Sequence, residues 1–155
     1  MPALLLLALV AGQVALSSML TPFHDYVGHC WKAEIERGTT DQHCIEAVYN
    51  GAHVRDRHVV THGGIAVYAG ESVYSDEDGQ ISFTYWNSLG GVGRGIADAA
   101  PGVLTFHLRM RATPDAQPEE VITTWRRTKV GYDVTTGAVT WHYTLDDRNA
   151  LQTQQ

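Results

Sequence analysis

Clusters of positive charge and compact metal-ligand motifs are both missing from this sequence. Its 11 Lys and Arg residues stand against 17 Asp and Glu residues, a formal net charge of −6, and no basic run is longer than two residues. Proteins that bind nucleic acids need a basic surface to meet the phosphates, so this class is excluded. No C-x-x-C or H-E-x-x-H motif occurs, so no dense ligand motif supports a zinc site.

Long amphipathic helices are also missing from the pattern. Only residues 21–26 resemble a short helical turn, so parallel βαβ units are not expected. The 155 residues suffice for one domain with a core and are too few for two. Apolar residues make up 44% of the chain and charged residues 18%, which is a globular composition.

The first twenty residues carry no charged side chain. An apolar block at 3–11 precedes Ala15-Leu16-Ser17, which resembles a signal-peptidase site. This pattern predicts a signal peptide over 1–17 and a periplasmic or secreted protein, with a domain at 18–146 and a polar tail at 147–155. A basic leader region is absent, and the alternative is a buried first helix. Polar residues interrupt the stretch, so no stable membrane span is expected once the signal is removed.

Period-two alternation broken by turn residues dominates the chain from Gly28 onward. It predicts nine strands: 28–36, 42–50, 53–60, 65–74, 80–88, 102–110, 119–128, 129–134 and 138–145. Asn50-Gly51 and Asp78-Gly79 are the strongest hairpin signals, because a type I′ turn needs a positive φ at both central residues. The predicted fold is all-β, an antiparallel meander of 8–10 strands closed as a barrel.

A glycine-rich segment at 90–95 interrupts this series. It misses the G-x-G-x-x-G pattern by one position, because Ile96 stands in place of the last glycine. No helix follows that could hold a phosphate at its N-terminus. The segment is therefore interpreted as a glycine-bent strand or a barrel corner, from which Arg94 could still point into a cavity.

The first hairpin carries two His-Cys dipeptides, His29-Cys30 and His43-Cys44. Neighbouring residues of a strand point to opposite faces, so these four groups cannot form one metal site. The apolar pattern turns the histidines inward and the cysteines outward. Two pairing registers place the apolar residues of both strands on the same face of the sheet. In the first register the numbers of paired residues sum to 74, so Cys30 lies opposite Cys44 around a loop at 35–39. In the second register they sum to 78.

The choice of register decides whether the two cysteines can bond. The second register separates them by roughly 13 Å, which is beyond the reach of a disulfide. Export and an even cysteine count favour a Cys30–Cys44 disulfide. The alternative is a pair of free or separately buried thiols.

Residues 22–31, PFHDYVGHCW, place a short turn and then Gly28 and Trp31 at the start of the first strand. This element resembles the entry of calycin-type barrels, namely the lipocalins, the fatty-acid-binding proteins and the nitrobindin-like families. The resemblance implies that Trp31 plugs one end of the barrel. The strand number is closer to the fatty-acid-binding or nitrobindin pattern than to the eight strands of a lipocalin. The resemblance also implies binding of a small apolar ligand or of haem, and a few relatives are enzymes.

The span 22–145 also looks like a family of small exported bacterial proteins without an assigned function. Three stretches carry this second likeness: TDQHC at 40–44, VRDRH at 54–58 and YWNSLGG at 85–91.

Nine residues are the predicted lining or mouth of a ligand-binding lumen: Trp31, His43, Asp56, His58, Tyr85, Trp86, Asn87, Arg94 and Trp125. Val54 and Val60 share a face with Asp56 and His58, which favours an inward position for this pair. The aromatic residues would bury the ligand, while Asp56, His58, Asn87 and Arg94 would hold its polar end. The predicted partner is a small apolar ligand, and the protein is expected to be a monomer.

Two alternative functions remain open. The first is a small barrel enzyme, of isomerase, cyclase or hydrolase type, with His58 as the base and Asp56 orienting it. The second is a packed barrel with a structural or interaction role, in which Asp56 forms a buried ion pair with an arginine such as Arg94.

No cofactor or metal is predicted. Haem stays open as an alternative through the nitrobindin resemblance, because His142 lies near the place where those barrels carry a haem-ligating histidine. Trp141 and Tyr143 occupy the apolar face of the last strand, so His142 is expected to face outward, which counts against haem.

Overall fold

Ten antiparallel strands follow one another along the chain, and the last closes on the first. The structure is a computed structural model that describes residues 14–146. The predicted tail at 147–155 and most of the predicted signal peptide lie outside the described residues. A 3₁₀ helix, η1 (Ser18–Phe23), precedes the strands β1 (His29–Glu36), β2 (Thr39–Val48), β3 (His53–His62), β4 (Ile65–Glu77), β5 (Gln80–Asn87), β6 (Val92–Ala100), β7 (Val103–Arg111), β8 (Glu119–Arg127), β9 (Gly131–Thr136) and β10 (Val139–Leu145).

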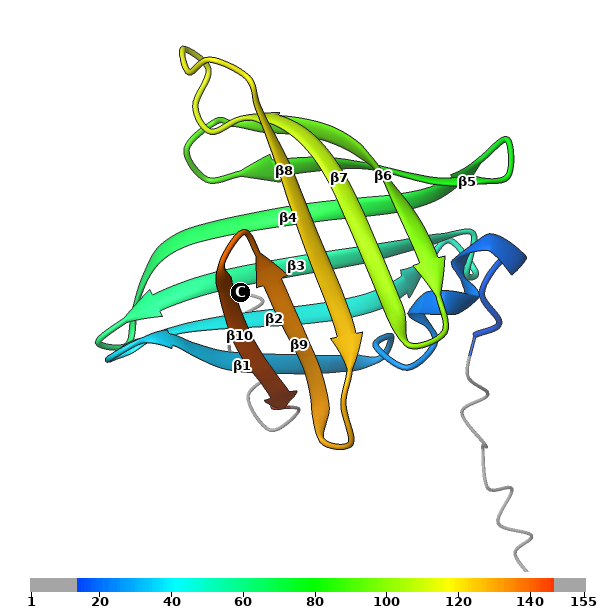
Figure 1. Cartoon of the computed structure of the whole chain (residues 1–155), viewed down its shortest axis with the longest axis horizontal. Coiled ribbons are helices and arrows are strands. Elements are labelled where there is room, and N and C mark those ends of the chain that lie inside the picture. The colour runs from blue at the N-terminus through cyan, green and yellow to red at the C-terminus, as the bar shows by residue number, and fades with distance from the viewer. Residues whose placement is uncertain (1–13, 147–155) are drawn as a thin grey trace, which may run out of the picture.

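The predicted all-β meander closed as a barrel is confirmed. Figure 1 shows β7–β10 crossing in front of β2–β4, so the two halves of the closed sheet face each other. A closed barrel leaves few exposed strand edges. No helix within residues 14–146 has the length and apolar character needed to cross a membrane.

The glycine-rich segment forms a full strand, β6. Its inner positions are Gly93, Gly95 and Ala97, and a Cβ on either glycine would collide with side chains of the neighbouring strands. Of the two interpretations of this segment, the glycine-bent strand is the one found. Glycine gives no apolar alternation for a sequence pattern to detect, which is why the strand was not among the nine predicted from alternation.

Two hairpin turns lie at the glycine-containing dipeptides Gly63-Gly64 and Asp78-Gly79. Asp78 and Gly79 have φ values of 53° and 78°, and Gly63 and Gly64 have 57° and 81°. Positive φ at both central residues matches the twist of the flanking strands.

The first hairpin adopts the register in which Cys30 faces Cys44 and Trp31 faces His43. The two cysteines form a disulfide, as predicted. The loop differs from the prediction, because an irregularity between Glu34 and Glu36 lets β1 and β2 pair as far as Glu36 and Thr39. A β-bulge of this kind adds a residue to one strand and increases its local twist.

Aromatic side chains from η1 and the segment after it plug one end of the barrel. The ring of Phe23 lies 4.6 Å from that of Tyr74, and the ring of Tyr26 lies 5.4 Å from that of Trp125. Trp31 belongs to the same cluster, and its indole N–H donates to the carbonyl of Tyr26 at 3.2 Å. Buried aromatic residues in edge and tilted contacts fill this end of the core.

Candidate functional site

A cavity of about 270 Å³ occupies the lumen beyond the aromatic plug. Its floor is formed by rings that also contact the plug, among them Tyr74, Phe106 and Trp125. Its wall combines polar and apolar side chains: Asp41, His43, Asp56, His58, Tyr68, Ser72, Phe83, Tyr85, Leu108, Met110, Thr123, Val134, Thr136, Trp141 and Tyr143. The described lining contains no Lys or Arg, so the charges in the cavity come from its carboxylates and imidazoles.

The polar wall is built from the same tripeptide pattern on two adjacent strands. Asp41-Gln42-His43 lies on β2 and Asp56-Arg57-His58 lies on β3. Because residues i and i+2 share a face, both acids and both histidines point into the lumen. His43 and His58 face each other across the two strands, and their rings stack with centroids 4.8 Å apart.

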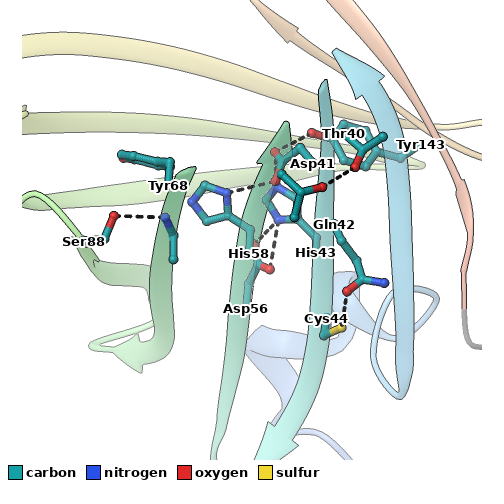
Figure 2. A network of polar contacts seen from close by, with 12 residues as sticks. Thr40, Asp41, Gln42, His43, Cys44, Asp56, His58, Tyr68, Ser88 and Tyr143 are labelled. Carbon is teal, nitrogen blue, oxygen red and sulfur yellow. Dashed lines mark hydrogen bonds and ion pairs between the residues drawn. The ribbon is translucent and has the colours of Figure 1, made fainter. Parts of the chain in front are cut away.

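The two carboxylates join the stacked imidazoles into one network (Figure 2). Asp56 accepts from His43 Nδ1 at 2.8 Å, and Asp41 Oδ2 lies 3.2 Å from His43 Nε2. Asp41 Oδ1 lies 3.1 Å from His58 Nδ1. The hydroxyl of Tyr143 donates to Asp41 Oδ2 at 2.8 Å. Asp41 thus contacts both imidazoles and the hydroxyl of Tyr143.

Both ring nitrogens of His43 face carboxylates, which only accept hydrogen bonds. Burial alone would lower the pKa of His43, but the charges of Asp56 and Asp41 outweigh it and raise this pKa to about 10. Burial likewise opposes ionisation of Asp41, yet His43 and His58 hold the pKa of Asp41 well below its usual range. The network therefore carries a positive charge on His43 between two negative ones.

A pair of tyrosines extends the network along the cavity wall. The hydroxyl of Tyr85 lies 3.1 Å from His58 Nε2, and the hydroxyls of Tyr68 and Tyr85 lie 2.5 Å apart. Burial and the contact with Tyr68 raise the pKa of Tyr85 well above its ordinary value, so this hydroxyl stays protonated. Gly70 makes the arrangement possible, because a Cβ there would collide with His58 Nε2 and the Tyr85 ring.

Five of the nine predicted lining residues lie on the cavity wall: His43, Asp56, His58, Tyr85 and Trp125. Trp31 is buried in the aromatic plug instead, in the position that the calycin resemblance implies.

Trp86, Asn87 and Arg94 do not line the lumen, which corrects the prediction for these three residues. Trp86 follows the inward Tyr85, so alternation turns it outward, and it is 42% exposed. Asn87 holds the turn after β5, where its Oδ1 accepts from the backbone N–H of Gly91 at 2.8 Å. Arg94 is exposed because the glycines on either side of it take the inner positions of β6.

The predicted pairing of Asp56 with His58 is also wrong. Asp56 pairs with His43 on the neighbouring strand, and Asp41 is the carboxylate that contacts His58. His43 and His58 lie directly opposite each other on β2 and β3. Each carboxylate therefore contacts the histidine that lies diagonally across from it on the neighbouring strand. The alternative ion pair between Asp56 and Arg94 is not formed either, since Arg94 lies on the outer surface.

Sequence reasoning missed Asp41, Tyr68 and Tyr143. The repeat of D-x-H at 41–43 and 56–58 was a usable signal for Asp41, because both tripeptides fall on strands of one hairpin. His142 faces outward as predicted, and it pairs there with Asp133 at 2.7 Å.

Comparison with known proteins assigns no family to the chain: no family model and no curated protein matches it. The closed ten-strand barrel is consistent with a calycin-like architecture at the level of the fold. A fold hosts many functions, so function is inferred from the site itself.

Proposed function

We propose that this protein is an exported barrel that binds a small, largely apolar ligand in its lumen. The observation that carries the proposal is the cavity of about 270 Å³ between an aromatic floor and a polar wall. A concave, mostly apolar pocket with a few convergent polar groups is the usual form of a ligand site. The cavity also counts against the packed-barrel alternative, in which side chains would fill the lumen.

The size and chemistry of the cavity suggest the class of ligand. A liquid water molecule takes roughly 30 Å³, so the cavity has the volume of about nine waters. This volume suits a ligand of one or two small rings that pack against Phe83, Phe106 and Trp125. The polar end of such a ligand would meet the hydroxyls of Tyr68 and Tyr85. Aromatic pairs in offset or edge contact add to the energy of burial.

The disulfide and the N-terminal pattern support the exported part of the proposal. Disulfides persist in oxidising compartments and are rare in the cytosol, and Cys30 and Cys44 are bonded. Like the fatty-acid-binding and nitrobindin-like barrels that the sequence resembles, the protein would then carry its ligand inside the sheet.

The acid-base enzyme alternative has less support. All four ring nitrogens of His43 and His58 already have a partner, on Asp41, Asp56 or Tyr85. A general base needs a nitrogen within hydrogen-bond reach of the proton that it removes. Ligand binding requires no such free nitrogen.

Native mass spectrometry of the protein purified from its own host tests the proposal. We expect a species heavier than the polypeptide by the mass of a small organic molecule, which disappears when the protein is denatured. A native mass equal to that of the polypeptide alone, in protein that is folded and disulfide-bonded, would contradict ligand carriage.

A further inference from the structure

We propose that Asp41, His43 and His58 form a binding site for a divalent transition-metal ion of the zinc class in the wall of the lumen. One donor atom from each residue lies within 4.8 Å of the donor atoms of the other two. The inference is independent of ligand carriage, because a metal ion can occupy this wall whether or not an organic molecule enters the cavity. It revises the expectation from sequence, which predicted no metal site.

The geometry of the donors carries the inference. His43 Nε2 and His58 Nδ1 approach the two oxygens of the same carboxylate, Asp41, at 3.2 and 3.1 Å. Ligands of a tetrahedral zinc ion with bonds of about 2.0 Å are separated by about 3.3 Å. The two N–O separations match this value, while the full set of donors spreads over up to 4.8 Å, so an ion that replaces the hydrogen bonds to Asp41 would draw the donor atoms closer together.

A shell of hydrogen bonds already fixes the far side of each donor residue. Asp56 accepts from His43 Nδ1, the Tyr85 hydroxyl meets His58 Nε2, and the Tyr143 hydroxyl donates to Asp41. Metal-binding imidazoles commonly donate their second N–H to a carboxylate, which sets the tautomer and the ring orientation. Asp56 supplies this arrangement for His43, leaving Nε2 directed at Asp41.

The charges of the wall also favour a cation. Asp41 and Asp56 contribute two carboxylates, and no Lys or Arg of the described lining balances them. Without a metal ion, the protonated His43 supplies the positive charge between these carboxylates. A bound ion would displace the proton from His43 Nε2, while Nδ1–H keeps its hydrogen bond to Asp56, so Nε2 becomes a lone-pair donor and the ion takes over the positive charge.

The donor set indicates the class of ion. Two imidazoles and one carboxylate suit Zn²⁺ and its neighbours Co²⁺ and Ni²⁺, whereas Ca²⁺ and Mg²⁺ prefer oxygen donors alone. Three protein ligands leave a coordination position, and the cavity adjoins all three residues. Water or an oxygen donor of a bound molecule can complete the coordination there.

Cobalt titration of the purified protein, stripped with a chelator and free of any affinity tag, tests the site. We expect one Co²⁺ per chain, with the intense visible bands of a four-coordinate complex that Zn²⁺ abolishes by displacement. His58→Gln should weaken Co²⁺ binding by about 100-fold or more, and Asp56→Asn, which removes only a positioning group, by about 10- to 100-fold. His142→Gln is the matched control, because it alters an exposed His-Asp pair on the outer surface.

Several results would overturn the assignment. These are a titration without four-coordinate bands, binding by His58→Gln equal to that of the parent protein, or binding lost equally in His142→Gln. Thermal unfolding in the presence of Zn²⁺ gives a second measurement on the unaltered chain: a bound ion raises the Tm. If Zn²⁺ leaves the Tm of the parent protein unchanged at concentrations that saturate the Co²⁺ signal, the site is likewise refuted.

Discussion

At the scale of single residues, the chemistry of this protein depends on the pairing of acids with histidines. The inner pair, Asp56 with His43, is almost fully buried and is held at 2.8 Å. The outer pair, Asp133 with His142, is equally short, but the histidine is largely exposed. Removing one member of a buried ion pair leaves the other charge without compensation, whereas water screens a surface pair.

We therefore expect the same substitution to have very different effects at the two positions. Asp56→Ala should lower the free energy of unfolding by about 3–5 kcal/mol, because His43 loses one of its two buried carboxylates. Asp133→Ala should change it by no more than about 1 kcal/mol. Urea denaturation of both variants, followed by circular dichroism, measures the difference. Equal losses would show that the inner network adds nothing beyond a surface pair.

At the scale of the elements, the first hairpin joins the two ends of the sheet. Within residues 14–146, β1 pairs with β2 over seven residue positions and with β10 over two, Trp31–Leu145 and Lys32–Thr144. The backbone N–H of Asp146 also donates to the carbonyl of Cys30 at 2.8 Å. The disulfide lies in β1 next to this short seam. It ties β1 to β2 where the barrel closes, so we expect it to contribute to the stability of the closure.

Removal of the disulfide tests this contribution. The double variant Cys30→Ser, Cys44→Ser should be less stable by about 3 kcal/mol, the entropy of closing a loop of this length in the unfolded chain. Guanidinium denaturation of the oxidised parent and the double variant gives the value. An unchanged midpoint and slope would mean that strand pairing alone closes the barrel.

The elements also show what the sequence can and cannot predict. Alternation and glycine turns predict nine strands and limit the first hairpin to two registers, because both depend on local geometry. The choice between the two registers came from the expected export and the even number of cysteines. The segment of β6 was left open between a glycine-bent strand and a barrel corner, because glycines occupy its inner positions. The pairing of Asp41 with His58 and of Asp56 with His43 depends on how side chains lean across two strands, which a one-dimensional pattern does not contain.

At the scale of the whole molecule, the barrel is plugged at one end and hollow beyond the plug. The aromatic residues of η1 and its neighbours fill one end, and the cavity lies between that floor and the network of Asp41, His43 and His58. Closed barrels of this size either fill their interior with side chains or hold one small ligand. We propose that this lumen belongs to the second kind and holds a ligand.

Two matched variants on β8 test this claim most directly. Thr123 lines the cavity, while Thr124, next to it on the strand, faces outward. In native mass spectra of protein purified from its own host, we predict that Thr123→Phe loses the organic adduct because the new ring fills the lumen. Thr124→Phe should retain the adduct at the level of the parent protein. An adduct that persists in folded Thr123→Phe would contradict binding in the lumen.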